Sequence, residues 1–304
     1  MAAPKTNGAA SNANGGDGNS KATVRNNGKD YARKKIDETF AKSTILDNSM
    51  MFPKFSKDEL TLGKLLGKGG FGSVFEVRGF SASSGGLSRH TSLVEGKKLA
   101  NYPNHVEDED EVAEGEMESR KFIADNCIRK GSGDARYAVK YLSQEIIDDP
   151  PMFIQAIMDM ATETRVLSDL QHPNIIKMRA MSTEDPYQEE YFIVMDRLYD
   201  TLEKRIQQWE RRTKRNSGLG GAFLDRKGEK KKNILEEKLV SAFDLSAALD
   251  YMHKRSILYR DIKPENIGYD IVSSFFLFFG AFIWLHLYVD FGANLPFFIS
   301  GRSH

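Results

Sequence analysis

The feature that most constrains the fold is a glycine-rich turn between two strand-like segments. Its glycines, Gly67, Gly69 and Gly72, form the pattern G-x-G-x-x-G-x-V, which ends at Val74. A dinucleotide-binding turn with this glycine spacing opens a helix, whereas Ser73–Val77 is β-branched, aromatic and alternating. We therefore expect the turn to join two strands, where its backbone can approach phosphate groups and offer N–H donors. An ordinary glycine hairpin is the alternative.

A lysine and a glutamate fall on the apolar faces of neighbouring predicted elements. Lys140 alternates with Ala138 and Leu142 on one face of a strand predicted over residues 136–142. Two prolines then open a predicted helix in which Glu163 lies on the apolar face. A buried ammonium is costly unless it is paired, so each group predicts the other as its partner. The alternative is an exposed Glu163. The apolar residues that define the helix face are Phe153, Ile157, Met160 and Leu167.

Residues 257–267 place an acid, a base and an amide within six positions bounded by apolar residues. Asp261 can accept a proton from a hydroxyl, and Lys263 can neutralise phosphate charge. Asn266 can supply an oxygen ligand to Mg²⁺. These groups match the parts of a phosphoryl-transfer site, where the protein positions groups and stabilises charge. A polar turn containing a proline is the alternative.

The 257–267 stretch closely resembles the H-R-D-x-K-x-x-N catalytic loop of eukaryotic protein kinases, with Tyr259 in the place of the histidine. The glycine turn looks like the kinase glycine-rich loop, and Lys140 with Glu163 looks like the pair that orients the lysine on the ATP phosphates. The resemblance implies an α+β, two-lobed protein-kinase-like fold with a complete small β-rich lobe and an incomplete helical lobe.

The resemblance also implies the activity of a protein serine/threonine kinase, with ATP and Mg²⁺ as cofactors and a protein bearing Ser or Thr as substrate. Asp261 would be the catalytic base, Lys263 would neutralise the γ-phosphate, and Asn266 with Asp290 would hold the metal. Met195 would be the gatekeeper, next to the backbone that bonds the adenine edge. The implied nucleotide-binding residues are Leu66, Gly67, Lys68, Gly69, Gly70, Phe71, Gly72, Ser73, Val74, Ala138, Lys140, Glu163, Met195, Asp196 and Leu198.

Composition at the two ends of the chain, and the lobes that the kinase resemblance implies between them, divide the chain into four parts. Residues 1–50 are rich in Gly, Asn, Ala and Ser and are predicted to be a disordered tail. Residues 58–197 form the predicted small lobe, and its insertion at 79–135 is interpreted as a solvent loop with a short helix from Glu116 to Cys127. Residues 198–270 begin the large lobe, with a short helix from Thr201 to Trp209, a basic loop over 211–233 and a long helix. The apolar stripe predicted on the long helix is Leu235, Leu239, Phe243, Leu249 and Met252.

The resemblance fails in residues 271–304, which form an apolar tail of uncertain status. An Asp-Phe-Gly sequence occurs at Asp290, about eleven residues later than the family spacing predicts. Three interpretations remain open: sequence from a mispredicted exon boundary, an inserted hairpin, or a membrane anchor, because residues 271–289 are long and apolar enough to span a bilayer. A catalytically silent ATP-binding pseudokinase or scaffold, attached to a membrane through 271–289, is therefore the alternative function.

Charge and cysteine content limit the kinds of partner and compartment that the sequence favours. The 43 basic and 43 acidic residues cancel, so no bulk attraction to nucleic acid or to an anionic membrane is implied. Cys127 is the single cysteine, which excludes an intramolecular disulfide and favours a reducing compartment. The N-terminal segment has no apolar core of a secretory signal. We expect a cytoplasmic or nuclear location, with membrane attachment as the minority alternative.

Overall fold

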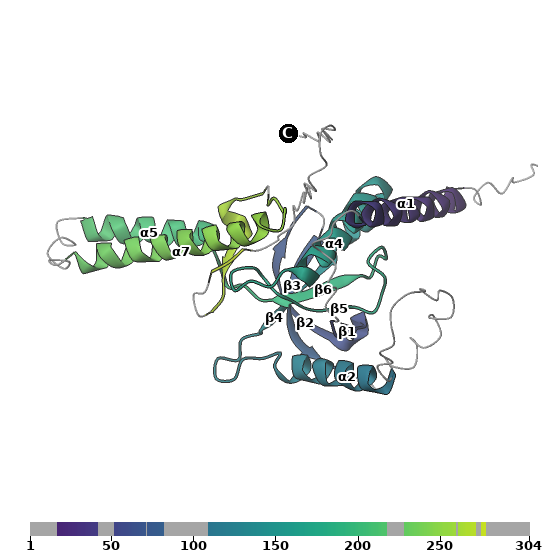
Figure 1. The fold of residues 1–304 in the computed structure, drawn as a ribbon, viewed down its shortest axis with the longest axis horizontal. Helices are drawn as coiled ribbons and strands as arrows, with labels where there is room; N and C mark the ends of the chain where they lie inside the picture. The colour runs from purple at the N-terminus through teal and green to yellow at the C-terminus, as the bar shows by residue number, and fades with distance from the viewer. Residues whose placement is uncertain are drawn as a thin grey trace, which may run out of the picture.

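A six-stranded sheet organises the computed structural model, which describes residues 17–41, 52–70, 72–81, 109–217, 228–259, 261–271 and 275–277 (Figure 1). The strand order is β1-β5-β6-β4-β3-β2. All neighbouring pairs are antiparallel except β1 with β5. The sheet, with helices against it, confirms the predicted α+β class. The strands are β1 (Lys54–Phe55), β2 (Leu60–Lys68), β3 (Gly72–Phe80), β4 (Tyr137–Leu142), β5 (Met178–Ser182) and β6 (Phe192–Asp196).

Strand β4 lies inside the sheet and is buried on both faces. Its alternation sends Ala138 and Leu142 into one hydrophobic cluster and Val139 into a second. The first cluster lies between the sheet and helix α4 (Pro150–Asp169), and the second lies on the opposite face of the sheet. Lys140 therefore points toward α4, as its place in the alternation predicts.

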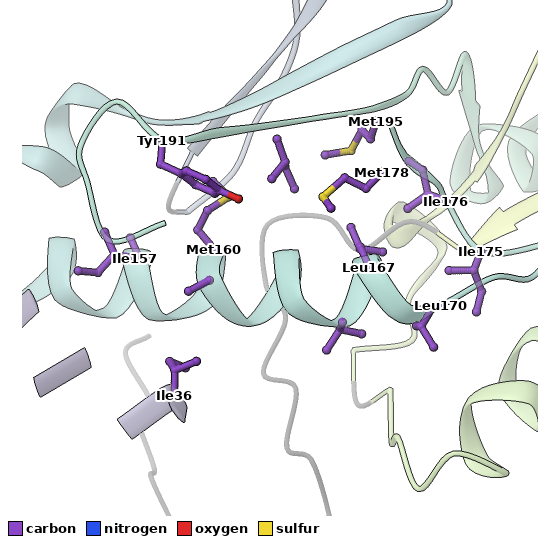
Figure 2. Packing of buried hydrophobic residues seen from close by; sticks show 14 of the residues in the cluster. Ile36, Ile157, Met160, Leu167, Leu170, Ile175, Ile176, Met178, Tyr191 and Met195 are labelled. Atoms are coloured by element: carbon purple, nitrogen blue, oxygen red, sulfur yellow. The ribbon is translucent and has the colours of Figure 1, made fainter. Parts of the chain in front are cut away.

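Helix α4 begins and packs as its sequence predicts. Asp149 caps the helix by accepting a hydrogen bond from the Met152 N–H at 3.1 Å, and prolines occupy the first two helical positions. The four predicted apolar residues are all at most 3% exposed. Figure 2 shows α4 with Met178, Tyr191 and Met195 on its sheet side and Ile36 on the other side. Short segments between these elements are η1 (Lys57–Glu59) and α3 (Gln144–Ile147).

The prediction of disorder for residues 1–50 is wrong for residues 17–40. These residues form helix α1 (Asp17–Phe40), which packs against α4 (Figure 1). Ala32, Ile36 and Phe40 recur every four residues and are buried in the first cluster. The average composition of this segment is polar, so it did not reveal the narrow apolar stripe. Burial of the stripe depends on α4, which lies more than a hundred residues later in the chain. Residues 1–16 and 42–50 lie outside the described residues.

Part of the predicted loop at 79–135 is also structured. Helix α2 (Glu109–Asp125) is followed by a turn that leads into β4, and Ile123 and Cys127 are buried in the second cluster. Arg120 of α2 forms a buried ion pair of 2.6 Å with Glu59 and lies 4.6 Å from the Phe55 ring centroid. The described part of the insertion therefore covers the sheet face opposite α4.

Beyond the sheet, helices α5 (Leu202–Ser217) and α7 (Glu229–His253) run side by side (Figure 1). The predicted basic loop over 211–233 is therefore wrong at both ends, because α5 continues to Ser217 and α7 already begins at Glu229. Trp209 of α5 donates a hydrogen bond of 2.7 Å to Glu237 of α7.

A second, antiparallel sheet has the order β7-β8-β9. Its strands are β7 (Asp200–Thr201), β8 (Ile267–Tyr269) and β9 (Phe275–Leu277), and η3 (Pro264–Asn266) precedes β8.

The apolar stripe predicted on α7 is buried at its C-terminal end only. Met252 is fully buried and Leu249 packs against the first cluster. Leu235, Leu239 and Phe243 are 56%, 59% and 73% exposed, so the prediction of a buried stripe is wrong for them. The physical reason is that α5 contacts α7 through polar side chains such as Glu237, on another face of the helix.

None of the described helices is long and apolar enough to cross a membrane. Of the proposed anchor at 271–289, only Ile271 and residues 275–277 belong to the described part of the chain.

Replacing Arg120 with Met should lower the free energy of unfolding by about 3 kcal/mol, because Glu59 would stay buried without its cationic partner. Urea denaturation of the full chain measures this change. Lys121→Met, at the next and exposed position of the same helix, is the control and should change stability by no more than about 0.5 kcal/mol. Equal stabilities of the two variants would contradict the role of α2 in the core.

Candidate nucleotide and phosphoryl-transfer site

The glycine turn joins two strands, as predicted. Lys68 pairs with Ser73 and Gly67 pairs with Val74, and the Gly69 N–H donates a hydrogen bond of 2.8 Å to the Gly72 carbonyl. A Cβ at Gly72 would lie 2.4 Å from a backbone oxygen of β4, whereas a Cβ at Gly67 would meet no atom within 4 Å. Gly72 therefore permits close packing of β3 on β4, and Gly67 faces open space. Phe71 lies outside the described residues.

A cavity of about 490 Å³ lies below this turn, between the glycine hairpin and the strand β6. Its volume is within the range of small-molecule sites. The Asp196 N–H is already bonded to the Lys177 carbonyl at 3.1 Å, so the predicted backbone contact of Asp196 with adenine requires its carbonyl oxygen. Predicted residues that line the cavity are Leu66, Gly67, Val74, Ala138, Met195, Asp196 and Leu198.

Sequence reasoning missed the floor of this cavity. Gly268 of β8 lies against Leu198, and a Cβ there would fall 2.3 Å from the Leu198 Cδ1 atom. The available signal was the glycine two residues after Asn266. The other lining residues missed were Lys64, Leu65, Arg197, Tyr199, Asp200, Thr201, Lys204 and Glu265. A larger cleft of about 840 Å³ lies between α2 and the end of α4, and the candidate residues do not line it.

The predicted pairing of Lys140 with Glu163 is present. The Lys140 Nζ atom donates a hydrogen bond to Glu163 Oε2, and the two side chains are 9% and 2% exposed. Burial raises the pKa of Glu163, and the charge of Lys140 opposes this shift. The second oxygen, Oε1, is buried and has no hydrogen-bond partner among the described residues. The pair joins strand β4 to helix α4 at one fixed point.

The predicted catalytic loop brings its three polar side chains together. Asp261 Oδ2 accepts a hydrogen bond of 2.6 Å from Asn266 Nδ2 and lies 3.0 Å from Lys263 Nζ. The same Asn266 amide also donates to the Asp261 carbonyl at 3.0 Å. Asn266 is buried, whereas Asp261 and Lys263 are partly exposed. The amide therefore fixes the orientation of a carboxylate that remains accessible from solvent.

Tyr259 occupies the position of the family's histidine and belongs to the buried core. Burial is the main cause that raises its pKa, and the charges of Asp261 and Glu163 raise it further. A hydrogen bond with Asn266 acts in the opposite direction. The tyrosine thus stays neutral and packs the loop against the rest of the core.

The oxygen donors fit a Mg²⁺ ion that arrives with ATP better than a metal site made by protein alone. Because the Asn266 amide nitrogen donates to Asp261, the carbonyl oxygen is the atom of this side chain that could ligate a cation, and Tyr259 also forms a hydrogen bond with Asn266. No group of three or more His, Cys, Asp or Glu side chains gathers within the described residues. Mg²⁺ commonly uses one or two protein oxygens together with substrate phosphates. Asp290, the second predicted ligand, lies outside the described residues.

Residues 124–275 match the family model of the protein kinase domain, which is half of the chain. The chain belongs to the protein kinase family. The match contains Lys140, Glu163 and the loop with Asp261 and Asn266. It begins beyond the glycine turn, which the insertion separates from β4.

Curated relatives are protein kinases of low identity. A probable myosin light chain kinase from Dictyostelium discoideum is 30% identical over 137 residues, which cover 43% of this chain and 22% of that protein. The Aurora kinase of Saccharomyces cerevisiae is 27% identical over 228 residues, 74% of this chain and 41% of that protein. Ribosomal protein S6 kinase alpha-2 of Mus musculus is 24% identical over 208 residues, which cover 63% of this chain and 23% of that protein. The chain spans less than half the length of each.

Gly72→Ala should affect the stability of the fold, whereas Gly67→Ala should affect ligand binding. The added methyl at Gly72 should destabilise the fold by about 2 kcal/mol, because it meets a backbone oxygen that cannot move freely. The methyl at Gly67 should leave the free energy of unfolding within about 0.5 kcal/mol but weaken ATP binding, since it projects into open space at the cavity. Urea denaturation and calorimetric titration measure the two effects. Equal stability losses would contradict the assignment.

Asp159, one turn before Glu163 on α4, should make stability depend on pH. Burial raises its pKa to about 7, well above its ordinary value. The folded state therefore holds a proton that the unfolded state has lost between about pH 4 and pH 7, and stability falls as pH rises through this window. Asp159→Asn should match wild type at about pH 4 and be more stable by about 4 kcal/mol at about pH 8.

Urea denaturation at these two pH values checks this prediction. Asp125→Asn, at an exposed position of α2, is the control and should follow the wild-type pH dependence. A pH dependence that Asp159→Asn leaves unchanged would show that another group causes it.

Proposed function

We propose that this chain is an ATP-dependent protein serine/threonine kinase, which transfers the γ-phosphoryl group of Mg-ATP to a Ser or Thr hydroxyl of a protein. The observation that carries the proposal is the pairing of Lys140 with Glu163 together with the Asp261–Asn266 hydrogen bond. Lys140 pairs with Val74 across the β3–β4 ladder, so the buried lysine lies beside the glycine turn. Membership of the protein kinase family supports the reaction class.

Each group has a role that its surroundings support. Lys140, oriented by Glu163, would hold the α- and β-phosphates of ATP. Asp261, oriented by Asn266, would accept the proton of the attacking hydroxyl, and Lys263 would neutralise charge on the γ-phosphate. The Asn266 carbonyl oxygen would help to hold Mg²⁺, which would supply neutralisation of the charge that develops on the phosphates. The cavity lined by Met195 and Leu198 would take the adenine.

Asp261→Asn should reduce phosphate transfer by about 10² to 10⁴-fold, the usual contribution of a general base, and leave ATP affinity within about threefold. Lys140→Met should instead weaken ATP binding as well as transfer, because it removes the phosphate contact. Transfer from labelled ATP to a generic Ser/Thr protein substrate and calorimetric ATP titration of the full chain measure the two. Asp250→Asn, whose side chain is 61% exposed on α7, is the matched carboxylate control and should behave as wild type.

The same two assays separate a kinase from a binding protein. ATP binding that depends on Lys140, without transfer by the wild-type chain, would support a catalytically silent ATP-binding scaffold. Transfer that survives both substitutions would contradict the assignment of the site.

A further inference from the structure

Helix α1 packs against α4 (Figure 1). Near the start of α4, the Arg25 guanidinium lies 4.9 Å from the Phe153 ring centroid. Near its end, the Arg165 guanidinium lies 5.2 Å from the Phe40 ring centroid. The two helices are therefore aligned in the same direction. Glu163 falls within the span of α4 that α1 covers.

The contact between the two helices is apolar and close. Ala32, Ile36 and Phe40 of α1 are at most 7% exposed, so the contact removes their apolar side chains from water. A Cβ at Gly28 would lie 2.4 Å from the Cδ1 atom of Ile154. Gly28 thus lets the helices approach more closely than any larger residue would. Figure 2 shows Ile36 on the side of α4 that faces away from the sheet.

Polar contacts tie α1 to the connection between β5 and β6 as well. Arg25 forms an ion pair of 2.7 Å with Glu189, and Arg33 donates two hydrogen bonds, of 3.0 and 3.1 Å, to Asp185. Lys29 donates to Gln188 at 2.9 Å. Because exposed ion pairs contribute little stability, their effect is mainly to fix the register of α1. Helix α1 therefore bridges α4 and the segment that leads into the central sheet.

The contact of α1 with α4 affects the buried ion pair, because Glu163 belongs to α4. Lys140 is fixed on an interior strand, whereas Glu163 moves with α4. Any displacement of α4 from the sheet separates two opposite charges that are both shielded from water, which is unfavourable. We propose that α1 is a positioning helix, which holds α4 against the sheet and keeps Glu163 paired with Lys140. The proposal extends the proposed function, because the pair is what would orient the ATP phosphates.

Ile36→Asp tests this inference in the full chain, because a carboxylate at this buried position should detach α1. We expect amide hydrogen exchange in residues 153–167 to accelerate at least tenfold. ATP affinity should fall about tenfold and adenosine affinity should stay unchanged, because adenosine has no phosphates for Lys140 to hold. Tyr31→Asp places the same charge at a position that is 60% exposed on the same helix, and should leave all three values unchanged.

Gly28→Leu is the second variant, since it separates the helices by steric contact without burying a charge. Adding Ile154→Ala to it makes room for the new side chain and should restore slow exchange in α4. Gly115→Leu, on α2 where a Cβ meets nothing, is the matched control. If the amides of α1 exchange freely in either variant while the exchange rate of the α4 amides stays unchanged, the inference is overturned.

The outcome for α1 is separable from the proposed function. If the wild-type chain binds no ATP, the proposed function fails, and the exchange rates of α4 still decide whether α1 positions it. If ATP and adenosine affinities fall together in Ile36→Asp, α1 acts on general stability and the inference is overturned.

Discussion

The buried ion pair of Lys140 with Glu163 is the interaction on which the arrangement of the described residues depends. Each charge is shielded from water, so each is tolerated only while the other stays in contact. The pair therefore imposes one register of α4 on the sheet, and it requires close packing around both groups. The large apolar side chains between α4 and strands β5 and β6 supply that packing (Figure 2). A specific electrostatic contact is thus stabilised by a nonspecific apolar one.

Segments outside the core pattern of the family reinforce both faces of the sheet. Helix α1 covers α4 on one side, and α2, from the insertion, covers the opposite face (Figure 1). Each brings an arginine to an aromatic ring and a carboxylate: Arg33 at Tyr187 and Asp185, and Arg120 at Phe55 and Glu59. The guanidinium suits this dual contact, because it is planar and weakly hydrated. The two helices use the same kind of contact, α1 on the connection between β5 and β6 and α2 beside the sheet.

Local pattern predicted the site better than it predicted the surrounding helices. Lys140, Glu163 and Asp261 were identified because alternation, helical spacing and residue order are all local signals. Helix α1 was missed because its three buried residues are a small part of a polar segment, and its ion partners are far away in sequence. The apolar stripe of α7 was predicted to be buried because periodicity identifies an apolar face but does not show whether another element covers it. Phe243 on that face is 73% exposed.

Tyr259 shows how the catalytic loop tolerates its departure from the family pattern. A histidine at this position would titrate near neutral pH and could bring a positive charge next to Asp261. The buried phenol, whose pKa is raised, brings none. The positive charge beside Asp261 is instead that of Lys263, at 3.0 Å, on the partly exposed side of the loop. The loop therefore keeps its packing through the aromatic ring, and the positive charge that balances Asp261 comes from a lysine that is partly exposed.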